Sequence, residues 1–336
     1  MTIIDIAKES GYSVSKVSRV LNNRRDVSPE AKKKIMEIVE SHNFVPNNNA
    51  KHLKQTVTKN MIVLVKGTLN MLFASIIEEI QRTVENTLYT VTVTYLDEDD
   101  NEVLEAIRLM RERKPVGILF LGGNPNFFKE SFEEVSIPCV LVTNNGADWG
   151  FQNLSSVATD DTLAAKAAVD YLFSCGHREI AVLGGDLQAS HTSLMRYRGC
   201  EKSFSEHGRA PKDLHYMKCR FSFDSAYRAM KKILEEKKPL TAVFAMSDVM
   251  AIGAIRAIRD AGLSVPDDIS VIGFDGTNLA DYYNPKLATI KQEYHVIARK
   301  SVEILFNVID FQKNAVHEII PFELTLGESV KDLTKH

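Results

Sequence analysis

The spacing of apolar residues changes near residue 60. Before that point apolar positions recur every three or four residues, as on one face of a helix. They are Ile3, Ile6 and Ala7 in a first stretch, and Val17, Val20 and Leu21 in a second. Beyond residue 60, short apolar runs alternate with amphipathic stretches. This pattern predicts a small all-α unit followed by a larger α/β body.

Boundary signals divide the first sixty residues into three helices. Thr2 and Asp5 have the spacing of a capping box, and Gly11 is placed to end the first helix. Ser13 can cap the second helix, and Ser28-Pro29 is a strong start for the third. Two short helices joined by a glycine-containing turn are typical of a helix-turn-helix, although a generic three-helix bundle has the same pattern.

The body contains strands and helices in alternation, which indicates parallel sheets covered by helices on both faces. The expected strands are 61–65, 90–95, 117–121, 139–142, 180–183, 242–245 and 270–273. The expected helices are 75–87, 102–112, 163–173, 225–236 and 249–261. Ligands of such folds bind beyond the carboxyl ends of the strands.

Charge is distributed unevenly along the 336 residues, whose net charge is -3. Residues 1–60 carry 11 Lys and Arg against 6 Asp and Glu, whereas the remainder carries 30 against 38. A basic segment on an acidic body fits a module that faces phosphates.

Several classes of protein lack support. No apolar run approaches the roughly 18 residues of a membrane span, and no secretion signal precedes the first helix, so we expect a cytoplasmic protein without a membrane partner. The four cysteines have no C-x-x-C spacing, which favours reduced thiols over a zinc site. No Walker sequence, G-x-G-x-x-G, H-x-x-x-H or G-x-S-x-G motif occurs, so we expect no enzyme, cofactor or metal.

The N-terminal sequence closely resembles the DNA-binding headpiece of the lactose-repressor/galactose-repressor family. The runs that carry the resemblance are Ile4–Ala7, Val17–Asn22, Val27–Glu30 and Phe44–Asn47. The resemblance implies a sequence-specific transcriptional regulator, a repressor, that binds a palindromic operator as a homodimer.

Within this headpiece the start of the second helix would choose the base sequence. Arg19 can pair in bidentate fashion with guanine, whereas Val14 can contact only an apolar group such as a thymine methyl. Lys16 stands where the family usually has a small residue, and it can add a phosphate contact. The candidate DNA-binding residues are Thr2, Ser13, Val14, Ser15, Lys16, Arg19, Asn22, Asn47, Ala50, Lys51 and Leu53.

Residues 47–53 are too few and too polar for a stable isolated helix, so they can be a disordered linker. The resemblance implies instead a hinge helix that folds on DNA, pairs with its copy in the dimer and inserts Leu53 into the minor groove. Such a wedge costs a few kcal/mol of unstacking, so two hinges must act together.

The body resembles the effector-binding core of the same family, which is similar to periplasmic sugar-binding proteins. The matching runs are Gly176–Arg178, Arg196–Gly199, Ser247–Gly253 and Pro266–Asp275. The fold class expected is therefore an all-α helix-turn-helix headpiece joined to an α/β periplasmic-binding-protein-like sensor of two lobes with parallel sheets. The expected boundaries are 1–46 for the headpiece, 47–56 for the hinge and 57–336 for the sensor, with lobe one at about 60–157 and 290–318 and lobe two at about 158–289 and 319–330.

The resemblance also implies residues that contact an effector. Arg196 matches an arginine that grips the effector and Asp275 an aspartate that accepts hydrogen bonds from its hydroxyls, while Phe221 matches a stacking position. Two departures, Thr143 for an aspartate and Ser247 for an asparagine, reduce the capacity to bind an ordinary hexose. The candidates are Phe73, Thr143, Arg196, Phe221, Ser247 and Asp275. Lys66, at the end of the first strand, would favour an acidic ligand if it faced the pocket.

These residues fit a sugar-like small molecule that controls operator affinity allosterically, as inducer or as corepressor. Two alternatives remain: a small-molecule binding module without DNA regulation, and a regulator whose effector is a partner protein. The sequence does not give the effector, the operator, the regulated genes or the choice between dimer and tetramer.

Overall fold

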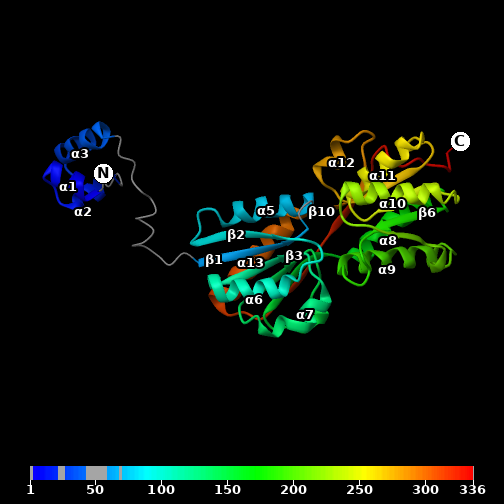
Figure 1. Cartoon of the computed structure of the whole chain (residues 1–336), viewed down its shortest axis with the longest axis horizontal. Coiled ribbons are helices and arrows are strands. Elements are labelled where there is room, and N and C mark those ends of the chain that lie inside the picture. Colours follow the sequence, from blue (N-terminus) through cyan, green and yellow to red (C-terminus); the bar gives the residue numbers. More distant parts are fainter. Residues whose placement is uncertain (1–2, 22–26, 43–58, 68–69, 336) are drawn as a thin grey trace. The chain divides into compact units, whose positions relative to one another are not determined.

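The computed structural model describes residues 3–21, 27–42, 59–67 and 70–335. The chain divides into two compact units, residues 1–58 and 59–336 (Figure 1). The change in apolar spacing near residue 60 lies close to this division, and the boundaries at residues 46 and 56 stay predictions.

The first unit contains the three predicted helices, α1 (Ile3–Ser10), α2 (Val14–Leu21) and α3 (Pro29–Ser41). Gly11 adopts a φ of +72°, so the turn between α1 and α2 uses a backbone conformation that favours glycine. Ser28 caps α3 by accepting a hydrogen bond from the Ala31 amide at 3.4 Å. The buried side chains shared by the three helices are Ile6, Ala7, Val17, Val20, Ile35 and Val39.

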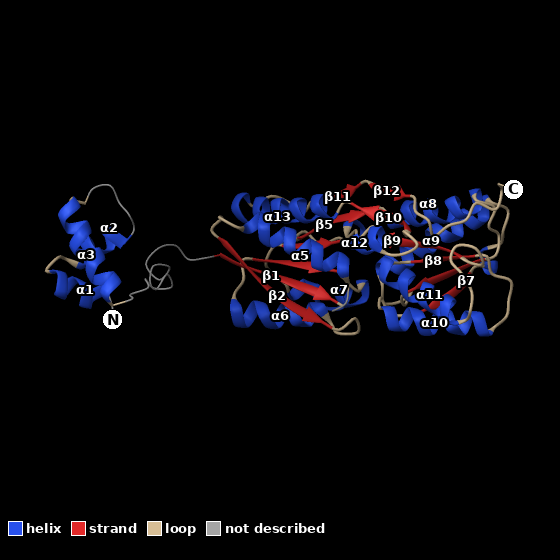
Figure 2. Ribbon diagram, turned by 90° about the horizontal axis from the view of Figure 1, so that it is seen from above, coloured by secondary structure: helices blue, strands red, loops and turns tan. Residues whose placement is uncertain are grey.

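The second unit contains two six-stranded sheets, each covered by helices on both faces (Figure 2). The sheet of lobe one has the order β11-β5-β4-β3-β1-β2 and is wholly parallel. Its strands are β1 (Lys59–Lys66), β2 (Tyr89–Leu96), β3 (Gly117–Leu121), β4 (Cys139–Val142), β5 (Leu154–Thr159) and β11 (His317–Ile320).

The sheet of lobe two has the order β12-β10-β9-β8-β6-β7. Its strands are β6 (Ile180–Gly184), β7 (His215–Lys218), β8 (Ala242–Ala245), β9 (Ser270–Asp275), β10 (Ala288–Gln292) and β12 (Phe322–Thr325). The edge strand β12 runs antiparallel to β10, whereas the other neighbours are parallel. The predicted class, two lobes with parallel sheets, is confirmed with this one antiparallel edge.

Alternate residues of β1 show how lobe one is layered. Met61 and Val63 pack with the helices α5 and α13, whereas Ile62 and Leu64 pack with α6 and α7. Because neighbouring strand residues point to opposite faces, an unbroken apolar run marks a strand buried on both sides. The helices of this lobe are α5 (Met71–Val84), α6 (Glu102–Arg113), α7 (Pro125–Ser131) and α13 (Tyr294–Phe311).

Lobe two follows the same plan. Its helices are α8 (Asp161–Ser174), α9 (His191–Glu206), α10 (Phe223–Glu235), α11 (Asp248–Asp260) and α12 (Asn278–Tyr282). Two close packings in this lobe depend on glycine. A Cβ at Gly199 would lie 2.3 Å from the Thr162 carbonyl oxygen, and one at Gly253 would lie 2.3 Å from the Phe223 carbonyl oxygen. These glycines let α9 approach α8, and α11 approach α10.

The chain passes between the two lobes three times. It leaves lobe one after β5, returns after β10, and crosses again between β11 and β12. Each lobe is therefore built from separate segments of sequence. Among the described residues, no helix is both long and apolar enough to span a membrane.

Candidate functional site

The start of α2 presents its side chains to solvent, as a recognition helix requires. The Ser13 hydroxyl accepts a hydrogen bond from the Lys16 amide at 3.3 Å, so the predicted cap is present. Val17 and Val20 are buried, whereas Val14 is 41% exposed and Arg19 lies on the exposed side. The helix is thus anchored by one face and open on the other.

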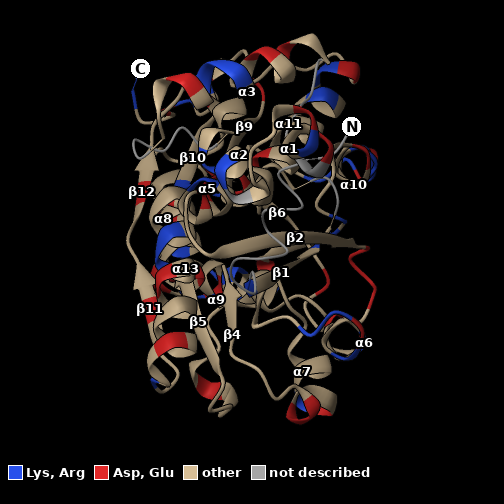
Figure 3. Cartoon of the chain, turned by 90° about the vertical axis from the view of Figure 1, so that its left-hand side faces the viewer, with Lys and Arg blue, Asp and Glu red and all other residues tan. Residues whose placement is uncertain are grey.

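Lys16 is held against an aromatic ring. Its ammonium lies 4.7 Å from the centre of the Tyr12 ring, and Lys34 of α3 approaches the same ring at 5.9 Å. Figure 3 shows the basic and acidic positions of α3. The Ser15 side chain lies outside what the structure describes, as do the predicted DNA-binding residues Thr2, Asn22, Asn47, Ala50, Lys51 and Leu53.

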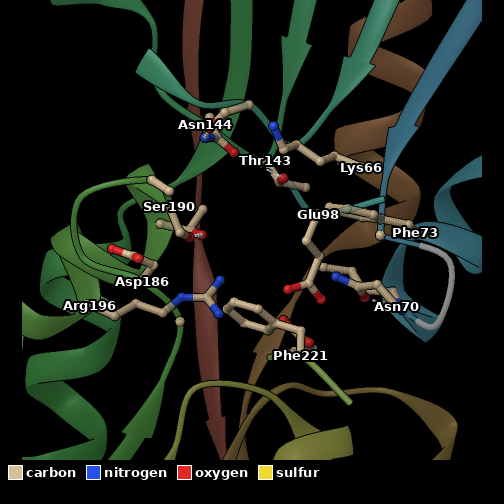
Figure 4. Close-up of a pocket in the computed structure, with 18 of the residues that line it drawn as sticks. Lys66, Asn70, Phe73, Glu98, Thr143, Asn144, Asp186, Ser190, Arg196 and Phe221 are labelled. Atoms are coloured by element: carbon tan, nitrogen blue, oxygen red, sulfur yellow. Dashed lines mark hydrogen bonds between the residues drawn. The ribbon is translucent and has the colours of Figure 1, made fainter. Parts of the chain in front are cut away.

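A pocket lies between the two lobes of the second unit (Figure 4). The empty space among its lining residues is about 880 Å³, including open solvent at the mouth. Five of the six effector residues predicted from the sequence line it: Phe73, Thr143, Arg196, Phe221 and Asp275.

Arg196 of α9 is fixed by groups of its own lobe. Its Nε donates to Asp161 at 2.8 Å and its Nη1 to the Met246 carbonyl at 2.5 Å. The guanidinium lies 3.6 Å from the centre of the Phe274 ring. Burial raises the pKa of Asp161, and the charge of Arg196 opposes that shift. Because Arg196 is only 4% exposed, its position is set before any ligand arrives.

Asp275, the last residue of β9, is buried beside Arg196. It has a φ of +112°, which is uncommon for a residue with a side chain, and accepts a hydrogen bond from Gln292 at 2.9 Å. Burial raises the pKa of Asp275 to about 8, Arg196 opposes this shift, and Asp248 adds to it. Burial therefore favours the neutral carboxylic acid, which can donate as well as accept hydrogen bonds.

The prediction that Ser247 contacts the effector is not supported, because Ser247 does not line the pocket. Its hydroxyl caps α11 by accepting a hydrogen bond from the Met250 amide at 3.2 Å. The neighbouring Asp248 accepts hydrogen bonds from the hydroxyls of Thr277 and Thr289 at 2.9 and 2.6 Å. Burial raises the pKa of Asp248 to about 6. These hydrogen bonds connect the start of α11 to β10 and to the start of α12.

Lobe one contributes Lys66 and Thr143 at the carboxyl ends of β1 and β4. Lys66 lines the pocket, but its ammonium forms an ion pair with Glu102 and donates to the Asp100 carbonyl at 2.8 Å. Its charge is thereby matched inside lobe one. Thr143 has a φ of +73°, and a β-branched residue in that region stores strain, which is typical of functional sites.

Lobe one also brings acidic side chains to the pocket, which the sequence did not predict. Glu98 and Asp99, just after β2, line the pocket. Arg220 of lobe two forms ion pairs with Asp97 and with Asp99, the second at 2.5 Å. The run Asp97–Asp100 directly after a strand was the available signal, because ligand-binding residues gather at such positions.

The lobes also touch at a second place. The side chain of Trp149, the one tryptophan in the sequence, meets His191 of α9 edge-on, with 5.6 Å between ring centres. Asn126 of α7 donates to the Gln188 carbonyl at 3.2 Å. Burial lowers the pKa of His191, so this contact is made by the neutral ring at neutral pH.

The described residues form neither a disulfide nor a metal site. The four cysteines are buried free thiols. Within the part of the chain that the structure describes, no group of three His, Cys, Asp or Glu side chains could hold a metal ion.

Two protein-family models match this chain. The model for bacterial regulatory proteins of the lacI family matches residues 2–47. The model for a periplasmic binding protein-like domain matches residues 169–330.

Curated relatives match over nearly the full length. The chain is 37% identical to the HTH-type transcriptional regulator MalR of Clostridium butyricum, over 98% of this chain and 99% of that protein. It is 32% identical to the HTH-type transcriptional repressor PurR of Histophilus somni, over 99% of both proteins. It is 30% identical to catabolite control protein A of Priestia megaterium, over 91% of each.

Solved structures share the fold. A Lac repressor dimer bound to operator and the anti-inducer ONPF has a TM-score of 0.77 at 23% identity, covering 98% of this chain and 99% of that one. A complex of the regulator CelR with cellobiose has a TM-score of 0.68 at 22% identity, covering 98% and 99%. At such identities the likeness shows the arrangement of elements, not the ligand.

Proposed function

The chain belongs to the lacI family of bacterial regulatory proteins and is a DNA-binding transcriptional regulator rather than an enzyme; from that premise we propose that it is a homodimeric repressor controlled by a small polyhydroxylated molecule bound between its lobes. One observation supports the ligand: a buried cation, Arg196, and a buried carboxyl, Asp275, line the same pocket. Buried polar groups that converge on a pocket are typical of binding sites for small polar molecules.

The pocket combines two kinds of surface. Phe73 and Phe221 offer apolar faces, whereas Arg196, Asp275 and Asn144 offer donors and acceptors. A sugar ring has a face of C–H groups and a rim of hydroxyls, so it matches both kinds. Relatives include the Ribose operon repressor of Haemophilus influenzae, whose name agrees with a sugar-related effector for this chain.

We assign DNA reading to the exposed start of α2. Arg19 would pair with a guanine edge, Val14 would contact a thymine methyl, and Lys16 would contact a phosphate. Leu53 would enter the minor groove at the centre of a palindromic operator, as the resemblance to this family implies. Effector in the pocket would change the angle between the lobes and so the pairing of the two hinges in a dimer.

Arg19→Ala tests the assignment of the reading helix. We expect specific operator binding to weaken by about 5- to 150-fold, since a bidentate contact to guanine contributes about 1–3 kcal/mol. The operator would first be selected from random duplexes with the full chain, and affinities measured by gel shift at fixed salt. Lys16→Ala is the matched control, because losing a phosphate contact weakens binding to all sequences alike.

The complex of the full chain with its selected operator also serves to test the effector proposal. A compound that releases the operator must bind more weakly to the DNA-bound protein, and a corepressor more tightly, because coupling is reciprocal. Arg196→Met should abolish either response. Regulation that persists in Arg196→Met would favour a partner protein as effector, and failure to bind any palindromic duplex at low salt would leave only a small-molecule binding module.

A further inference from the structure

Glu98 faces the pocket from lobe one and stands apart from its acidic neighbours. Asp97 and Asp99 on either side form the ion pairs with Arg220. Glu98 forms a longer ion pair with the same arginine, with 3.8 Å between its carboxylate oxygen and the Arg220 Nε. Its side chain is 30% exposed. In Figure 4 the Glu98 carboxylate points into the space opposite Arg196.

The cations of the pocket are already paired with protein carboxylates. Lys66 is paired with Glu102, and Arg196 with Asp161. Asp186 also lines the pocket, but its carboxylate is paired with Lys218 outside the lining. Among the described residues, the cations that line the pocket are Lys66 and Arg196, and each already has a carboxylate partner. An anionic ligand would therefore find no unpaired positive charge there.

Glu98 and Asp99 bring two carboxylates to this side of the pocket, and a ligand bound there would meet them. A carboxylate accepts hydrogen bonds from hydroxyl and ammonium groups and repels phosphate and carboxylate groups. Burial raises the pKa of Glu98, whereas Arg220 and the Phe221 amide oppose that shift.

We propose that Glu98 is a specificity-determining residue of the effector site, and that it selects an uncharged or amino-substituted polyol against phosphorylated and acidic sugars. This inference rests on the proposed function, namely that the pocket holds the effector. It also corrects the expectation that Lys66 favours an acidic ligand, because the Lys66 charge is matched by Glu102.

The position of Glu98 links selection to lobe closure. Arg220 of lobe two is ion-paired with Glu98, and the ring of the next residue, Phe221, lines the same pocket. A ligand that stacks on this ring therefore places its polar rim near Glu98. An anionic substituent at that rim would repel Glu98. The repulsion would weaken ligand binding and would also disfavour the closed form, in which the lobes are close together.

The test uses the purified full-length chain and a bacterial metabolite extract. Compounds retained through gel filtration are identified by mass spectrometry, and their affinities are then measured by calorimetry. For the best-retained compound, the neutral, amino, phosphorylated and carboxylated forms are compared. We expect the neutral or amino form to bind at least about tenfold more tightly than the anionic forms.

Glu98→Gln should reduce this discrimination to less than about threefold while keeping binding of the neutral form, because the amide has the same shape without the charge. Asp186→Asn is the matched control, since it removes a lining carboxylate that is paired with Lys218, and it should leave the discrimination unchanged. An unchanged ratio in Glu98→Gln would overturn the inference.

Two further outcomes separate this inference from the proposed function. Preferential retention of a phosphorylated or carboxylated compound would overturn the role of Glu98 and leave the effector site standing. Retention of no compound, with operator binding that no extract fraction alters, would overturn the effector site itself and this inference with it.

Discussion

The two lobes position their pocket residues in different ways. In lobe two, Arg196 is fixed by Asp161, and Asp275 by Gln292, all within that lobe. In lobe one, the acidic segment 97–99 has hydrogen bonds within its own loop and is also ion-paired with Arg220, which lies across the pocket in lobe two. The pocket groups of lobe two are therefore prepared in advance, whereas the acidic segment of lobe one gains contacts when the lobes meet.

This difference separates two tasks. Prearranged groups bind without a further loss of side-chain freedom, so lobe two can capture a ligand. Groups that contact the opposite lobe make those contacts only when the pocket is closed. Lobe one can therefore couple ligand binding to a conformational change. Substitutions in the two lobes should therefore differ in kind: those in lobe two change stability and affinity, and those at the acidic segment change closure.

Arg196→Met should have the largest effect. It leaves Asp161 buried without its cation, and breaking a buried pair costs about 3–5 kcal/mol of the free energy of unfolding. Urea unfolding at pH 7 measures the loss, and Arg220→Met in an exposed ion pair is the control. Equal losses in both variants would contradict the distinction between the lobes.

Asp275→Asn should alter the pH dependence of unfolding. Because burial raises the pKa of Asp275 to about 8, the folded chain holds this proton more tightly than the unfolded chain. The contribution is greatest below pH 3.8 and is lost as the pH rises through about 8. Relative to the Asn variant, wild type should lose up to about 1.4 kcal/mol per pH unit in this window. Parallel pH profiles from urea unfolding at pH 5, 6.5 and 8 would contradict the assignment.

Arg220→Ala should change the free energy of unfolding only slightly, but it should measurably shift the equilibrium between the open and closed forms of the two lobes. The ion pairs with Asp97 and Asp99 are exposed, so we expect a shift of about twofold to fivefold between open and closed forms. Trp149 fluorescence reports this shift, because its ring contacts His191 of the opposite lobe. High salt should reproduce the effect in wild type and not in the variant. A salt response that survives in Arg220→Ala would assign closure to other charges.

The pattern of apolar residues predicted those strands whose burial is visible in the sequence. It missed β5, β7, β10, β11 and β12. In β5, Ser155 and Ser156 interrupt the apolar run although both are buried. The Ser155 hydroxyl accepts from the Val316 amide at 3.1 Å, and the Ser156 hydroxyl hydrogen-bonds His317 at 2.8 Å. These partners lie 161 residues away, so no local pattern could show that the serines are satisfied.

Residues of the pocket lining could be predicted where the residue type has one common role at that position. The resemblance placed Arg196 and Asp275 in the pocket, and both line it. Ser247 was assigned to the ligand, but a hydroxyl before a helix can cap that helix instead. Glu98 was missed because an acidic run after a strand is most often solvated, and its contact with Phe221 joins distant parts of the chain.

The three passages between the lobes have a consequence for synthesis of the protein. The strands β11 and β12 complete the two sheets, and both come from residues 317–325. During translation, neither sheet can acquire its last strand until the ribosome has made more than 300 residues. Until then β5 and β10 are unpaired edges, which are sites of aggregation. The nascent chain therefore exposes these two edges until its final segment closes both sheets together.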